Sequence, residues 1–144
     1  MNPRRRARVL ALQVLYEVDS SKHLPGLVLS RHLVELMETE PDAATDEMRA
    51  YAARLVSGVV EQRAQLDAQI ASCAPNFPVD SLAPVDRNIL RVALYEIGQN
   101  NPEIPVKVSV NEAIEIAKEF AADNAPKFIN GVLGAAIVRY HQGP

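Results

Sequence analysis

Several residue types are scarce in this chain of 144 residues, and each scarcity excludes a class of protein. The single cysteine, Cys73, cannot form an intrachain disulfide, so the chain suits a reducing compartment rather than a disulfide framework. No apolar run approaches the ~18 residues that a membrane-spanning helix needs. Tryptophan is absent and aromatic residues are few, whereas Ala and Leu are plentiful, which favours helix.

Motifs of known catalytic chemistry are also missing. The chain has no glycine-rich phosphate loop, no GxSxG elbow and no HExxH helix. Three scattered histidines lack the spacing of metal ligands: His23, His32 and His141. Cys73 lies on an apolar stripe, which predicts a buried structural thiol. Nothing in the sequence argues for an enzyme, a metal or a cofactor.

Positive charge is concentrated at one end of the chain, in Arg4, Arg5, Arg6 and Arg8. The remaining sequence holds 11 basic against 18 acidic residues. Asn2 and Pro3 read as an N-cap and a first helical residue, which places the arginines where a helix dipole disfavours cations by about 0.3–1 kcal/mol each. Guanidinium groups and helix-start amides both bind phosphate, so contact with a nucleic acid accounts for this placement. A solvated, disordered basic tail is the alternative.

Apolar residues at helical spacing predict an all-α fold of six or seven helices without strands. The predicted helices span residues 3–18, 27–37, 46–73, 85–98, 109–120 and 125–140. Thr45 offers an N-cap, and Gly58 is a candidate for a kink or for a close helix crossing. Residues 109–112 match a capping box, although that helix could begin nearer Val106. Phe120 is expected to be buried, and Gly131 and Gly134 to permit close helix contact.

The prolines between residues 75 and 84 divide the chain into two halves of three main helices each. We therefore predict one domain over residues 1–144, with an N-terminal subdomain at about 1–74 and a C-terminal subdomain at about 79–141. The acidic stretch from Glu38 to Asp42 reads as a solvated loop, and no function follows from its sequence.

Several segments together resemble the NusB family of bacterial transcription antitermination factors. They occur in family order and at family spacing, from the N-terminus to about Gly134: residues 4–8, 13, 15–16, 84–87, 89–91, 94–96, 110–113, 117–118 and 127–133. This resemblance implies an all-helical protein of two packed three-helix subdomains. It also implies binding to the boxA element of nascent ribosomal RNA together with NusE, and action in the cytoplasm on RNA polymerase with other Nus factors.

The resemblance assigns RNA contact to eight residues: Arg4, Arg5, Arg6, Arg8, Gln13, Asn124, Lys127 and Phe128. Phe128 beside Lys127 at a helix start suits a stacking platform, and its alternative is ordinary core packing. Gln13 either reads a base edge or is solvated. Asn124 caps the last helix, contacts RNA, or does both, since its NH₂ stays available when its oxygen caps. Relatives often have Asp at position 124, so we expect Asn124 to favour RNA slightly.

The same resemblance assigns contact with the protein partner to Tyr16 and Asp86. Core packing with a satisfied hydroxyl is the alternative for Tyr16, and helix-start stabilisation is the alternative for Asp86. Asn111 and Glu112 are predicted to be structural, as a polar brace and as part of the capping box.

Two other functions remain open from the sequence. One is a helical protein-interaction adaptor with incidental RNA binding, and the other is the RNA-binding domain of an RNA methyltransferase. The chain starts at Met1 and ends at Pro144 without a methyltransferase sequence, which argues against the methyltransferase alternative. We expect the function to be that of an antitermination factor.

Overall fold

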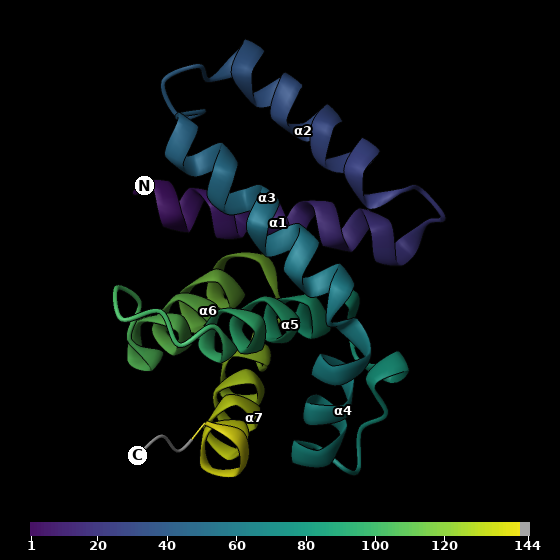
Figure 1. The fold of residues 1–144 in the computed structure, drawn as a ribbon. Coiled ribbons are helices and arrows are strands. Elements are labelled where there is room, and N and C mark those ends of the chain that lie inside the picture. Colours follow the sequence, from purple (N-terminus) through teal and green to yellow (C-terminus); the bar gives the residue numbers. More distant parts are fainter. Residues whose placement is uncertain (142–144) are drawn as a thin grey trace. The chain divides into compact units, whose positions relative to one another are not determined.

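A computed structural model describes residues 1–141, which form seven α-helices and one 3₁₀ turn and contain no strand (Figure 1). The all-α prediction is therefore confirmed. The helices are α1 (Pro3–Ser20), α2 (Pro25–Thr39), α3 (Asp46–Glu61), α4 (Arg63–Cys73), α5 (Pro84–Gly98), α6 (Val106–Phe120) and α7 (Ala125–Tyr140), with the 3₁₀ turn η1 at Val79–Ser81.

The chain divides into two compact units, Met1–Glu61 and the part from Gln62 onward. The sequence placed this division later, near the prolines at residues 75–84. The difference arises because α4 packs against α5 and α7 rather than with the first three helices. The first unit thus has three α-helices and the second has four, instead of three in each.

In the first unit, α1 packs against both α2 and α3 (Figure 1). Its core cluster consists of Ala7, Leu10, Leu36, Ala44, Met48 and Ala52. Two predicted N-caps are confirmed by hydrogen bonds. The side-chain oxygen of Asn2 accepts from the N–H of Arg5 at 2.8 Å, and the hydroxyl oxygen of Thr45 accepts from the N–H of Met48 at 3.1 Å.

Two predictions about helix bounds are wrong. The long helix expected over residues 46–73 breaks at Gln62, whose φ of −103° and ψ of 15° leave the helical region, whereas Gly58 is buried within α3. Helix α2 continues to Thr39, so Glu38 is helical and the acidic loop is shorter than predicted. Periodicity missed the break because apolar residues continue on both sides of it.

In the second unit, α5 contacts α4, α6 and α7, and every residue from Asn88 to Ile97 is buried. Its Arg91, 2% exposed, donates from Nε and Nη2 to the two carboxylate oxygens of Asp67 in α4 at 2.7 and 3.0 Å. Arg91 also donates to Asn88 Oδ1 at 3.1 Å. Such a bidentate pair fixes the register of α4 against α5.

The predicted capping box at residues 109–112 is wrong, and the alternative start is confirmed, because α6 begins at Val106. Ser109 therefore lies inside the helix, where its hydroxyl donates to the buried carboxylate of Glu96 in α5 at 2.6 Å. Glu112 is buried as well, while Asn111 is exposed and does not brace two helices. A polar group that seemed to be a local cap is in fact a contact between helices.

Helix α7 buries Ile129, Val132, Leu133 and Ala136, as its periodicity predicts. Gly131 and Gly134 are both exposed, and a Cβ built on either meets no atom within 4 Å beyond its chain neighbours and its own helix backbone. They do not mediate close helix contact in the described chain. Phe120, predicted to be buried, is 39% exposed at the end of α6.

Candidate nucleic-acid interface

The four N-terminal arginines occupy different environments in the first turns of α1. Arg4, Arg5 and Arg6 are half-buried. Arg8 is only 4% exposed, and its guanidinium lies 6.0 Å from the ring centroid of Tyr51. Successive helical residues point about 100° apart, so neighbouring arginines cannot share one face. A phosphate contact from Arg8 would require this side chain to leave the tyrosine ring.

Arg6 is ion-paired across the first unit with Glu40, the residue that follows α2. The side chains are 26% and 55% exposed, respectively. Glu40 belongs to the acidic stretch for which the sequence indicated no function. Because it pairs with Arg6, the Glu40 carboxylate neutralises the charge of one arginine of the basic cluster.

Gln13 and Tyr16 lie on the outer face of α1, and both are exposed. The seven-residue spacing from Arg6 to Gln13 places both on one side of the helix. Tyr16 is 44% exposed, so the alternative of core packing for this residue is wrong. An amide and a phenol are thus presented together on one helical face.

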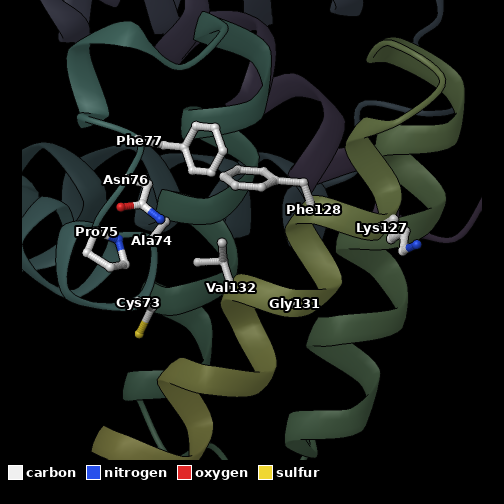
Figure 2. A pocket seen from close by; sticks show the side chains of 9 residues that line it. All are labelled: Cys73, Ala74, Pro75, Asn76, Phe77, Lys127, Phe128, Gly131 and Val132. Atoms are coloured by element: carbon white, nitrogen blue, oxygen red, sulfur yellow. The ribbon is translucent and has the colours of Figure 1, made fainter.

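A pocket of about 320 Å³ opens in the second unit (Figure 2). Its walls are the segment that follows α4 and the first two turns of α7, including Lys127, Phe128 and Val132. Phe77 and Phe128 meet edge to face, with ring centroids 5.5 Å apart and ring planes at 75°. Figure 2 shows the two rings next to each other, with Lys127 on the same turn of α7 as Phe128.

The segment bearing Phe77 is held in place by polar contacts. The N–H of Phe77 donates to the carbonyl of Ala74 at 3.0 Å, which closes a turn after α4. Nη1 of Arg87 in α5 donates to the carbonyls of Val79, Asp80 and Leu82 at 3.2–3.4 Å. These bonds anchor the loop to α5, so the pocket has a defined wall rather than a loose one.

Phe77 is a candidate binding residue that the sequence analysis missed. It lies between Pro75 and Pro78, outside any helical period, and it is 52% exposed. An aromatic residue enclosed by prolines in a loop was the only available signal. Cys73, predicted to be buried, is half-buried and lines the same pocket, so that prediction is wrong.

Asn124 occupies the N-cap position of α7, but its side chain makes no capping hydrogen bond. The alternative in which Asn124 caps through its side chain is therefore wrong. Asn124 and Lys127 are both exposed at this helix start, and Phe128 is half-buried between solvent and the pocket. The helix start thus presents an amide, an ammonium and an aromatic ring within five residues.

Asp86 lies in the first turn of α5 and is half-buried. Burial raises the pKa of the Asp86 carboxyl above its usual value, because desolvation disfavours the charged form. A carboxylate in a first turn interacts favourably with the helix dipole, which agrees with the alternative that Asp86 stabilises the start of α5. Tyr16 belongs to the first unit and Asp86 to the second.

A second charged cluster surrounds Glu17 near the end of α1. The Glu17 carboxylate accepts from Arg31 and lies 3.3 Å from ring nitrogens of both His23 and His32. The Arg31 hydrogen bond, followed by the two histidine contacts, lowers the pKa of Glu17 to about 2. This cluster ties α1 to the middle of α2 and to the loop that precedes it.

Among residues 1–141, no group of His, Cys, Asp and Glu is arranged to hold a metal ion. Within the same range, no helix combines the length and apolar character that a bilayer crossing requires.

Comparison with known proteins identifies relatives over almost the whole chain. A model of the NusB family matches residues 5–137. The transcription antitermination protein NusB of Chloroflexus aggregans is 44% identical over 138 residues, covering 95% of this chain and 88% of that protein. The protein of the same name from a Roseiflexus species is 40% identical over 140 residues, covering 96% and 94%.

Solved structures agree with this match. T. maritima NusB has a TM-score of 0.84 at 29% identity, covering 96% of this chain and 92% of that one. A structure of the antitermination factors NusB and NusE in complex with dsRNA includes a chain with a TM-score of 0.82 at 28% identity, covering 97% and 99%.

Proposed function

Because the chain belongs to the NusB family, we propose that it is a non-catalytic, RNA-binding transcription antitermination factor. It binds boxA-type single-stranded RNA in ribosomal RNA transcripts, together with NusE. It acts in the bacterial cytoplasm within the antitermination complex of RNA polymerase and other Nus factors.

The pocket beside Lys127 is the observation that carries this proposal. Single-stranded RNA is recognised by stacking of unstacked bases on aromatic rings and by cations that contact the backbone. Phe128 and Phe77 supply rings at an open pocket, and Lys127 supplies an exposed cation on the same helical turn. Duplex bases stay stacked, so the pocket favours a single strand.

The N-terminal turn of α1 supplies the phosphate contacts. Arg4, Arg5 and Arg6 are accessible to solvent, and the start of α1 adds a positive dipole end. Arg8 supports this turn through its contact with Tyr51, and we assign it a phosphate contact only after a change of rotamer.

Gln13 and Asn124 supply hydrogen bonds to RNA. Both are exposed amides, and an amide both donates and accepts, so it can pair with a base edge. The uncommitted side chain of Asn124 fits this role better than it fits capping. Position 124 holds no negative charge, which favours a polyanionic ligand.

Contact with NusE is assigned to Tyr16 and Asp86. The exposed ring of Tyr16 offers a large amphipathic contact of the kind enriched at protein interfaces. Half-burial of Asp86 in a helix start makes it a carboxylate that a donor from a partner would readily satisfy. The variants Tyr16→Ala and Asp86→Asn should weaken NusE binding while leaving RNA binding by the isolated chain unchanged.

Binding of a short fluorescent boxA-type RNA tests the function directly. We expect the chain to bind the single strand, to bind it more tightly with NusE, and to bind weakly when the strand is annealed to its complement. Equal affinity for single strand and duplex would contradict the pocket mechanism. NusE binding without any RNA binding would indicate a protein adaptor instead.

The lone cysteine provides an independent readout of the pocket. Cys73 lines it and is half-buried, so a thiol reagent should label the protein and bound RNA should slow that labelling. The control is Phe128→Ala, in which RNA at the same concentration should no longer protect Cys73. If saturating RNA leaves the labelling rate of Cys73 unchanged, RNA binds outside this pocket.

A further inference from the structure

The ion pair between Arg6 and Glu40 joins the basic cluster to the acidic stretch of the first unit. Glu40 follows α2 directly, and its N–H donates to the carbonyl of Leu36 at 2.7 Å. This bond fixes the backbone of Glu40 at the end of the helix. The carboxylate is therefore presented to Arg6 by a structured helix end rather than by a loose loop.

Helix stability does not explain where these two charges are placed. Glu40 lies at a helix C-terminus, where the dipole disfavours an anion, and Arg6 lies in a first turn, where it disfavours a cation. Each charge is unfavourable for its own helix. The ion pair accounts for both positions, because the attraction between the two charges offsets the unfavourable interaction of each charge with its own helix dipole.

A carboxylate and a phosphate compete for the same guanidinium group, because both accept its N–H donors in similar geometry. We propose that Glu40 is an internal competitor of RNA phosphate at Arg6, and that it thereby sets the affinity of this chain for RNA. This inference rests on the proposed function. It assigns a role to the acidic stretch, which no motif had explained.

The exposure of the pair determines how strong the competition is. Side chains 26% and 55% exposed form a pair that water and salt weaken, and such pairs have small net energies. RNA can therefore displace Glu40 without unfolding anything. Removing the carboxylate should tighten RNA binding about threefold at low salt.

The matched pair of variants is Glu40→Gln and Asp42→Asn. Both remove one negative charge from the same stretch, but Asp42 forms no ion pair with a described residue. We expect Glu40→Gln to lower the Kd for boxA-type RNA about threefold in 50 mM salt, and Asp42→Asn to leave it nearly unchanged. Equal gains in both variants would show a long-range charge effect and overturn the proposal.

Dependence on Arg6 is the second requirement. In an Arg6→Ala background, Glu40→Gln should give no gain, because the competitor has lost its target. The gain should also vanish near 1 M salt, where the Debye length is about 3 Å. A gain that persists without Arg6 would assign the effect to another site.

A probe other than RNA separates this inference from the proposed function. Inorganic tripolyphosphate is titrated while the side-chain Nε–Hε signal of Arg6 is followed by NMR. Glu40→Gln should respond at about one-third of the tripolyphosphate concentration that the unmodified chain needs. If Glu40→Gln and the unmodified chain give identical tripolyphosphate titrations, the competition is rejected even if RNA binds. If the titration of Glu40→Gln is shifted to lower concentration, the competition is supported even if boxA-type RNA does not bind.

Discussion

Identical side chains near the N-terminus of α1 have different neighbours, and those neighbours decide what each arginine can do. Arg6 is ion-paired with Glu40, and Arg8 lies over Tyr51 with 4% exposure. The charge of the cluster was readable from sequence. The different neighbours of Arg6 and Arg8 could not be predicted from the sequence, because Glu40 and Tyr51 lie more than thirty residues away.

The aromatic pair of the pocket gives a prediction at single-residue scale. Phe77→Ala and Phe128→Ala should each weaken RNA binding about 5- to 150-fold, since stacking contributes ~1–3 kcal/mol per base. Fluorescence anisotropy with boxA-type RNA measures the change. Val138→Ala is the control, because Val138 is an exposed apolar residue of α7 outside the pocket. Unchanged affinity in both Phe variants would exclude stacking here.

Glu17 gives a second residue-scale prediction, on stability against pH. Its folded-state pKa of about 2 lies below the ordinary 4.5, so its ionised form stabilises the fold above pH 4.5. That contribution is lost as pH falls from 4.5 towards 2. Thermal unfolding of Glu17→Gln should show a deficit against the unmodified chain at pH 6 that disappears near pH 2. A deficit independent of pH would refute the linkage.

At the scale of elements, caps and apolar stripes were largely predictable from sequence. The caps by Asn2 and Thr45 are confirmed, as is the buried stripe of α7. The break at Gln62 was not predicted, and the start of α6 at Val106 was predicted only as the alternative to a capping box. Ser109 resembled a cap in the sequence because its hydrogen-bond partner, Glu96, lies in another helix.

The contact between α4 and α5 gives a prediction at this scale. Asp67→Asn should destabilise the fold by about 3 kcal/mol, because it leaves the buried guanidinium of Arg91 without its counter-charge. Chemical denaturation measures the difference. Asp80→Asn, at an exposed carboxylate of η1, should change the free energy of unfolding by less than about 0.5 kcal/mol. Similar effects from both variants would contradict a special role for the pair.

For the whole molecule, binding to a polyanion must overcome a formal net charge of −3. The local cluster on α1 rather than the total charge must therefore attract RNA. A chain of this composition would otherwise repel nucleic acid. The strength of binding should depend steeply on salt, since phosphate contacts release counterions.

Replacing Arg4, Arg5 and Arg6 together with Gln should flatten this salt dependence. Each phosphate contact with single-stranded RNA contributes about −0.7 to the slope of log K against log salt, so the slope should become shallower by about 2. Anisotropy titrations from 50 to 400 mM salt measure it. A slope that does not differ from that of the unmodified chain would remove the arginines from the interface.

The sequence by itself determined the all-α class, most helices and the family, because helical periodicity, caps and ordered motifs are local properties of a chain. It also identified Lys127 and Phe128 as candidates, since both lie within one motif. Only the tertiary structure decided that Phe77 meets Phe128, that Ser109 bonds Glu96, and that Glu40 pairs with Arg6. Each of these contacts joins residues from different elements, and no local pattern specifies which distant side chain will lie opposite.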